Sequence, residues 1–238
     1  MPKMNFVQLG ASRKDTVPFV MQGCKAQKVA IYAGIGAALA KDVELALGKI
    51  KVTYQRIGES DIKRNKLKDY SILTIPGGYT QEYVRVLSGD GFKNIREFVR
   101  NGGTYIGICA GAYIATSRVE VPDHPIGIGI IDIDNKRETD MRIRSIEIVN
   151  PNHPIAKGCP SKINIWYQNG PMISPGNNVD VIAIYENNVA AIVVSTHGKG
   201  KVIIFSPHPE GSIEGKVDPE KLGTLKLLRN AIDFAVQE

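Results

Sequence analysis

The feature that most constrains the fold is an alternation of short, continuously apolar segments with helical patterns over residues 28–108. Continuous apolar segments of strand length predict strands that are buried on both faces. The predicted strands are Lys28–Ala33, Val52–Arg56, Tyr70–Ile75 and Thr104–Ile108. Helices are predicted at Ala38–Leu47 and at Gly91–Arg100, and glycines end the second one. This alternation predicts an α/β fold, in which helices cover both faces of a parallel sheet.

The second half of the chain has a different pattern. Its apolar segments are short and strand-like, and Gly, Asn and Pro separate them. These segments are Ile126–Ile133, Met141–Val149, Lys162–Tyr167, Val179–Tyr185, Ala190–Ser195 and Lys201–Phe205. Gly198–Gly200 is predicted to be a tight hairpin turn, and a final helix is predicted from Pro219 to Val236 with Asp218 as its N-cap. We therefore expect antiparallel extensions of the sheet in this half.

Composition excludes several classes of protein. The chain of 238 residues has a net charge of +6. Its densest basic cluster is flanked by Asp61 and Asp69 and contains no aromatic residue that could stack on a base. No nucleic-acid partner is therefore expected. No segment approaches the roughly 20 apolar residues of a membrane span. The three cysteines, Cys24, Cys109 and Cys159, lack metal-site spacing, so neither a metal nor another cofactor is predicted. They favour a reducing, cytoplasmic location.

Domain organisation follows from the same patterns. No linker-like composition divides the chain, so residues 1–238 are interpreted as a single domain with residues 1–27 as an N-terminal extension. The oligomeric state is left open by the sequence.

A candidate nucleophile lies between a predicted strand and a small-residue helix. The segment Gly107–Gly111 has the sequence G-I-C-A-G, with Cys109 at its centre. Glycine–X–nucleophile–X–glycine at a strand-to-helix turn is a nucleophile elbow, which lifts the central side chain above the sheet. The N-terminus of the following helix favours the reactive thiolate. We therefore predict that Cys109 is a catalytic nucleophile.

A candidate base follows the last predicted strand. His208 lies in the sequence S-P-H-P-E, and Glu210 is two residues further on. In an extended segment, side chains two residues apart lie on the same side, so Glu210 is placed to orient the His208 imidazole. His124 and His153 precede prolines and His197 lies at the predicted hairpin, so these three are interpreted as turn or surface residues.

Other parts of the site are predicted with open alternatives. The amides of Ala110 and of Gly78, or of Gly77 instead, are the candidate oxyanion hole, because both loops follow parallel strands. Tyr79, Tyr113 and Asn169 are candidate substrate-pocket residues, although each could equally serve in packing.

These motifs together resemble a known superfamily. Pro76–Gly78, Gly107–Gly111 and His208–Glu210 are similar to the three characteristic segments of class I glutamine amidotransferase-like proteins. More narrowly, Gly102–Tyr113 and Tyr167–Pro171 resemble the amidotransferase-like N-terminal domain of biotin–protein ligases, which also occurs as a stand-alone protein. The resemblance implies a flavodoxin-like, doubly wound, mainly parallel sheet with antiparallel strand extensions. It also implies a Cys-His-Glu triad.

Two departures from the pattern bear on function. Glutaminase domains usually have Gln four residues after the cysteine, and this chain has Tyr113 there. No Gly-Arg-Gly-Arg-type ligase loop and no synthase domain are found in the sequence. The resemblance therefore implies a small amide-type substrate or ligand, and a protein partner that supplies a synthase or ligase function.

Three functions remain open at the level of sequence. The first is a cysteine hydrolase that acts on a carbon–nitrogen amide bond through Cys109, His208 and Glu210. The second is a catalytically silent module that binds a small molecule or regulates a partner, which Tyr113 favours. The third is a cysteine peptidase on the same scaffold, because the fold alone does not determine the chemistry.

Overall fold

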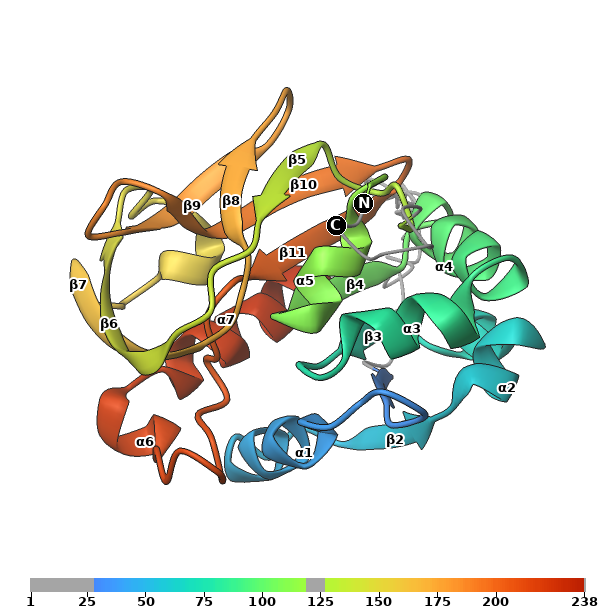
Figure 1. Ribbon diagram of the computed structural model, residues 1–238, viewed down its shortest axis with the longest axis horizontal. Helices are drawn as coiled ribbons and strands as arrows, with labels where there is room; N and C mark the ends of the chain where they lie inside the picture. Colours follow the sequence, from blue (N-terminus) through green and yellow to red (C-terminus); the bar gives the residue numbers. More distant parts are fainter. Residues whose placement is uncertain (1–27, 119–126, 238) are drawn as a thin grey trace, which may run out of the picture.

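Parallel strands form the centre of the fold. The computed structural model describes residues 28–118 and 127–237, which form a sheet in the order β2-β1-β3-β4-β11-β10-β9-β6-β7, with β8 paired to β10 and β5 to β8 (Figure 1). Neighbouring strands from β2 to β11 are parallel. Their bounds are β1 Val29–Tyr32, β2 Tyr54–Ile57, β3 Ile72–Ile75, β4 Thr104–Ile108 and β11 Gly200–Phe205. The predicted α/β class is confirmed.

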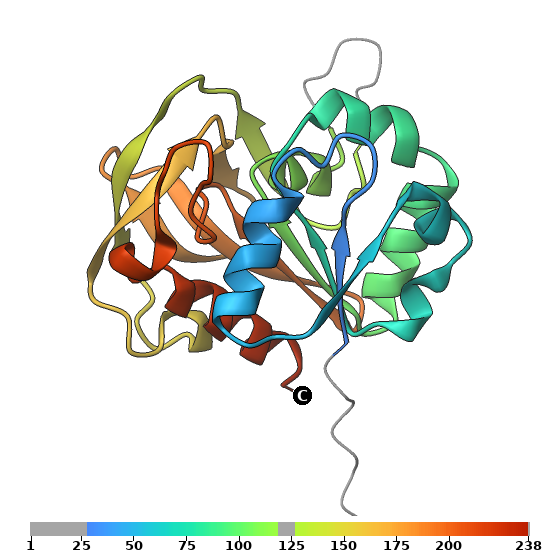
Figure 2. The same cartoon turned by 90° about the horizontal axis from the view of Figure 1, so that it is seen from below.

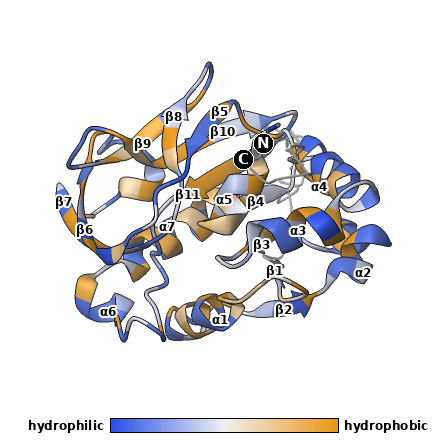
Figure 3. Cartoon of the chain, viewed as in Figure 1, coloured by the Kyte–Doolittle hydropathy of each residue, from blue (hydrophilic) through white to orange (hydrophobic). Residues whose placement is uncertain are grey.

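Helices cover both faces of these strands. The strands and these helices together are called the parallel region below. Val29 and Ile31 of β1 pack in one core with α1 and α7, whereas Ala30 and Tyr32 pack in a second core with α2 to α5. Figure 2 shows these helical layers on opposite sides of the strands. The helices are α1 Ala40–Lys49, α2 Glu59–Lys63, α3 Thr80–Leu87, α4 Asp90–Arg100, α5 Ala110–Ala115, α6 Pro219–Leu222 and α7 Leu225–Ala235, with a 3-10 turn η1 at Lys66–Asp69. Hydrophobic residues are concentrated on central strands such as β11 (Figure 3).

The remaining strands form the antiparallel region. They are β5 Ile133–Lys136, β6 Met141–Ile148, β7 Lys162–Gln168, β8 Met172–Pro175, β9 Asp180–Tyr185 and β10 Ala190–His197, with a second 3-10 turn η2 at Pro154–Ala156. The hairpin predicted at Gly198–Gly200 is confirmed, because His197 pairs with Gly200 and leaves a two-residue turn in which Gly198 has φ +63°. Strand β11 thus joins the two regions, since it pairs with β10 on one side and with β4 on the other.

Two predicted elements differ from the structure. The strand predicted at Ile126–Ile133 is wrong over its described part, because residues 127–131 form no strand and β5 begins only at Ile133. The single helix predicted from Pro219 to Val236 is interrupted at Gly223, which has φ +74° and ends α6. The predicted N-cap is confirmed, since the Asp218 side chain accepts a hydrogen bond from the Glu220 amide. The sequence patterns did not indicate α3 or β8.

Candidate active site

Cys109 lies in a strained turn between β4 and α5. Its φ of 51° and ψ of −104° are unusual for a residue with a side chain, and its side chain is buried at 6% exposure. The flanking glycines are required by close contacts. A Cβ at Gly107 would lie 2.7 Å from the Gly111 carbonyl oxygen, and one at Gly111 would collide with the Ile75 carbonyl oxygen. The local sequence therefore determines the elbow geometry, as predicted.

His208 and Glu210 follow β11 and are both buried. The His208 amide donates to the Trp166 carbonyl oxygen, and His208 Nδ1 lies 2.8 Å from Glu210 Oε1. Burial alone would lower the pKa of His208, but the Glu210 carboxylate and the Cys109 sulfur outweigh it and hold this pKa well above its ordinary value. Within the described residues, Glu210 Oε2 is buried without a hydrogen-bond partner. The pair is thus arranged to stabilise a charged imidazole.

The carbonyl oxygen of Gln168, at the end of β7, contacts both reactive groups. It lies 3.3 Å from Cys109 Sγ and 3.4 Å from His208 Nε2. The bridge between Trp166 and His208 places this strand end beside the loop after β11. The structure therefore brings Cys109, His208 and Glu210 together under Gln168. Sequence reasoning did not identify Gln168 as a site residue, although Tyr167–Pro171 was one of the segments that resemble the biotin–protein ligase N-terminal domain.

The loop after β3 supplies backbone groups to the site. A Cβ at Gly77 would lie 2.9 Å from His208 Cε1 and 3.5 Å from Cys109 Cβ, so this residue borders the site. Neither the Gly78 amide nor the Ala110 amide has an acceptor among the described residues. The buried Tyr83 hydroxyl donates to the Pro76 carbonyl oxygen at 3.0 Å. The oxyanion hole predicted at Ala110 and at Gly78 or Gly77 stays a prediction, and of the two glycines it is Gly77 that contacts the site.

The three predicted pocket residues have different environments. Tyr79 is 66% exposed and precedes α3, so its side chain projects from the loop beside the site. The Tyr113 hydroxyl donates to the Asn169 carbonyl oxygen at 3.3 Å. Asn169 has φ +54°, and its Oδ1 accepts from the Asp140 amide at 2.9 Å. Tyr113 and Asn169 therefore make structural contacts in the segment that covers Cys109.

A buried polar layer supports this covering segment. Arg144 of β6 is 4% exposed and lies over the Tyr185 ring, 4.3 Å from its centroid. Its guanidinium pairs with Glu186 at 3.2 Å. The Tyr167 hydroxyl donates to the Gly170 carbonyl oxygen at 2.6 Å, and burial raises the pKa of Tyr167. These contacts fix the strand ends from which Gln168 reaches the site.

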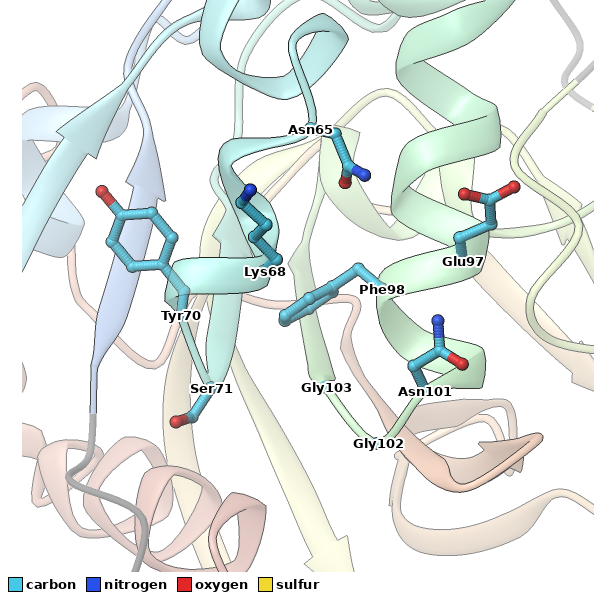
Figure 4. A pocket seen from close by; sticks show the side chains of 9 residues that line it. All are labelled: Asn65, Lys68, Tyr70, Ser71, Glu97, Phe98, Asn101, Gly102 and Gly103. Atoms are coloured by element: carbon cyan, nitrogen blue, oxygen red, sulfur yellow. The ribbon is translucent and has the colours of Figure 1, made fainter.

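A cavity of about 250 Å³ lies away from Cys109, at the amino ends of β3 and β4 (Figure 4). It is lined by Asn65, Lys68, Tyr70, Ser71, Glu97, Phe98, Asn101, Gly102 and Gly103. Parallel α/β sheets bind their ligands at the carboxyl ends of the strands, where Cys109 lies. The geometry of reactive groups therefore identifies the candidate active site, and this cavity does not.

The described residues contain no group of three or more His, Cys, Asp or Glu side chains that could hold a metal ion. In the same residues, no helix is long and apolar enough to cross a membrane. Cys24 and His124 lie outside the described residues. His153 caps the turn at Pro154–Ala156 by accepting from the Ile155 amide, in agreement with its interpretation as a turn residue.

Comparison with known proteins supports the resemblance seen in the motifs. Residues 28–139 match the family described as biotin-protein ligase, N terminal. The chain is 27% identical over 172 residues to the biotin–protein ligase of Schizosaccharomyces pombe. The aligned segment covers 61% of this chain but only 26% of that protein. The chain is 28% identical over 169 residues to the pyridoxal 5'-phosphate synthase subunit PdxT of Koribacter versatilis, covering 71% of this chain and 81% of that protein.

Solved structures agree at the level of the fold. The structure of PurLQS from Thermotoga maritima matches with a TM-score of 0.68 at 17% identity, covering 87% of this chain and 98% of that chain. A glutamine amidotransferase from the same organism matches with a TM-score of 0.61 at 15% identity, covering 89% and 99%. The predicted resemblance to class I glutamine amidotransferase-like proteins, with the biotin–protein ligase N-terminal family among them, is confirmed.

Proposed function

We propose that this protein is a cysteine hydrolase that acts on a carbon–nitrogen amide bond, with Cys109 as nucleophile, His208 as base and Glu210 as the residue that orients the base. One observation supports this most strongly: a buried cysteine in a strained elbow shares a site with a histidine whose Nδ1 lies 2.8 Å from a buried carboxylate. Buried ionisable groups in this arrangement are more typical of catalysis than of packing.

The proposed reaction proceeds through a thioester. His208 takes the thiol proton, and the Cys109 sulfur attacks the amide carbon to form a tetrahedral intermediate. The Gly78 and Ala110 amides stabilise its oxyanion, with Gly77 as the alternative to Gly78. The carbon–nitrogen bond breaks as the imidazolium donates its proton to the leaving amine. His208 then removes a proton from water as its oxygen attacks the thioester. The carbon–sulfur bond breaks, the acid leaves, and the imidazolium returns its proton to the Cys109 sulfur.

The substrate is proposed to be a small amide. Cys109 is 6% exposed, and the Gln168 carbonyl contacts its sulfur, which disfavours an extended polypeptide as substrate and so a peptidase. Tyr113 occupies the position where glutaminases usually have Gln, and its hydroxyl is bonded to the Asn169 carbonyl. Glutamine is therefore one candidate among small amides. Tyr79, Tyr113 and Asn169 are proposed to border its pocket.

A protein partner belongs to the same proposal. PdxT is named as a synthase subunit, and the S. pombe protein that includes a similar segment is named as a ligase. We infer that this chain acts with a partner that supplies a synthase or ligase function. We also infer a single amidotransferase-like domain, a cytoplasmic location and chemistry without a cofactor.

Thiol alkylation tests the proposal without knowledge of the substrate. Iodoacetamide labelling is followed at each cysteine by peptide mass spectrometry from pH 6 to pH 9, in wild type and in His208→Ala. We expect Cys109 to keep a larger share of its pH 9 labelling rate at pH 6 than Cys159 does. Cys159 should lose its rate there, because burial raises its pKa. If His208→Ala lowers the labelling rate of Cys109 at pH 6, the result supports a Cys109–His208 pair. If the pH dependence of Cys109 labelling is the same in both proteins, the result contradicts the pair.

A catalytically silent binding or regulatory module is the second candidate. The observation that favours it is the Gln168 carbonyl, which lies within 3.4 Å of both His208 and Cys109 and occupies the space where a substrate would react. This candidate predicts ordinary thiol reactivity of Cys109 and saturable binding of a small ligand. Turnover of any amide that is abolished by Cys109→Ala would eliminate it.

A further inference from the structure

The peptide bond between Gln168 and Asn169 points its oxygen at both reactive groups. The distances are 3.3 Å to Cys109 Sγ, which donates to this oxygen, and 3.4 Å to His208 Nε2, which can donate to it when it carries a proton. A thiolate has no proton to donate, and it would face the negative end of the peptide dipole. The observed orientation of this peptide therefore stabilises the neutral thiol.

We propose that the Gln168–Asn169 peptide is a switch for the Cys109 site and that the structure holds it in the inactive position. This inference rests on the proposed function, because it concerns regulation of the same nucleophile. Rotation of the peptide plane changes only ψ of Gln168 and φ of Asn169. After rotation the Asn169 N–H faces the sulfur in place of the carbonyl oxygen, and an N–H donor stabilises both a thiolate and an oxyanion.

The backbone of Asn169 favours two positions. In the inactive position its φ is +54°, a left-handed conformation that asparagine adopts more readily than other residues with a side chain. Rotating the peptide by about half a turn brings φ of Asn169 into the negative range that such residues prefer. Both positions are therefore accessible to the Asn169 backbone, and specific contacts favour the inactive one.

Those contacts centre on Asp140. The Asn169 N–H donates to the Asp140 carbonyl oxygen at 2.9 Å, and the Asp140 N–H donates to Asn169 Oδ1 at 2.9 Å. The following peptides are held separately, since the Tyr113 hydroxyl donates to the Asn169 carbonyl and the Tyr167 hydroxyl to the Gly170 carbonyl. Rotation breaks the backbone bond from Asn169 to Asp140 and leaves the two tyrosine contacts in place. Asn169 is therefore a positioning residue that acts through the Gln168 carbonyl.

Other ionisable groups near Cys109 stay unchanged when residue 169 is varied. His208, backed by Glu210, lies beside the sulfur on the loop after β11, and the Tyr83 hydroxyl of α3 donates to the Pro76 carbonyl of the loop that borders the site. Tyr167 of β7 and Tyr185 of β9 also interact with Cys109. A change in the reactivity of Cys109 on substitution at residue 169 therefore reports the orientation of the peptide.

The test compares iodoacetamide labelling of Cys109 in the full chain, relative to Cys159, in wild type and two variants. Asn169→Ala removes the side-chain bond to Asp140 and disfavours the left-handed backbone, so we expect labelling at pH 7 to be about tenfold faster. The ratio of rates at pH 6 and pH 8 should also rise. Asn169→Gly removes the bond but tolerates positive φ, so the increase should be about threefold. Asn65→Ala is the matched control, because Asn65 has φ +59° at the opposite end of the sheet.

If Cys109 of Asn169→Ala is labelled within about twofold of the wild-type rate, the switch is overturned, because the backbone preference predicts a change of about tenfold. If this variant fails to fold, Asn169→Gly decides, and a wild-type rate there overturns the switch as well. The two proposals fail differently. If the triad is inactive, the labelling of Cys109 has the pH dependence of an ordinary thiol, but Cys109 is still labelled faster in Asn169→Ala than in wild type. An absent switch leaves both Asn169 variants at the wild-type rate while His208→Ala still reduces reactivity at pH 6.

Discussion

The parallel and antiparallel regions contribute to the candidate site in different ways. In the parallel region, the ends of β4 and β11 position Cys109, His208 and Glu210 through local turns that glycines and prolines determine. In the antiparallel region, β7 contributes a backbone oxygen rather than a side chain, and this oxygen covers the sulfur. Under the proposed function, the parallel region supplies the reacting side chains and the antiparallel region controls access to them.

The largest expected effect distinguishes Cys109 of the parallel region from Cys159 of the antiparallel region. For any small amide whose turnover is detected by release of ammonia, glutamine included, Cys109→Ala should lower the rate by roughly 10³-fold or more, because the covalent step is lost. Cys159→Ala, in the antiparallel region, should leave the rate within about twofold, since this side chain is half-buried and away from the site. Equal losses in the two variants would remove the distinction between the regions.

Glu210→Gln should have the next largest effect. The variant keeps the shape of the side chain but removes the charge that raises the pKa of His208, so burial should then lower this pKa and turnover should fall by roughly 10²-fold. NMR titration of His208 measures the shift. In wild type the raised pKa contributes stability below the unfolded value of about 6.5, and this contribution is lost as pH rises through the folded value. A Glu210→Gln protein with the same pH dependence of unfolding would contradict this account.

Arg144→Met tests the antiparallel region alone. The substitution removes a buried guanidinium from above Tyr185 and Tyr167 and from its ion pair with Glu186, so we expect a loss of about 1–3 kcal/mol in the free energy of unfolding. Urea denaturation measures it. The matched control is Arg142→Met on the same strand, where the exposed pair with Asp140 should contribute less than about 0.5 kcal/mol. Similar losses would show that burial of Arg144 is unimportant.

The smallest predicted effects compare two glycines of the parallel region. Gly223→Ala should destabilise the protein by about 1 kcal/mol, because φ of +74° between α6 and α7 disfavours a side chain. Gly48→Ala in α1 meets open space and should stabilise by about 0.5–1 kcal/mol. Thermal unfolding should therefore move in opposite directions, and a stabilised Gly223→Ala would contradict the assigned break between the helices.

The same regions differ in how far the sequence predicts them. The elbow at Cys109 was predictable because the requirement for Gly107 and Gly111 is local, and the pairing of His208 with Glu210 depends on residues two apart. The contact of Gln168 with Cys109 was not predictable, because it depends on the pairing of β7 with β6 and on the bridge from Trp166 to His208. Such registers are determined by packing between distant segments.

Errors in the predicted elements have similar causes. Helix α3 begins at polar residues, Thr80 to Glu82, after a glycine-rich loop, so its apolar face was too short to recognise. The final helix was predicted as continuous because a single glycine is tolerated in helical patterns, whereas Gly223 adopts positive φ. In the described part of the strand predicted before Ile133, Ile128, Ile130 and Ile131 are buried in irregular backbone.

The position of β11 between β4 and β10 has a consequence for the order of synthesis. Cys109 emerges from the ribosome early, on a strand whose partner β3 is already made, but β11 and His208 come near the end of the chain. Domains generally fold as units. The thiol is therefore synthesised before the proposed base, and the two groups come together only when β11 is inserted beside β4.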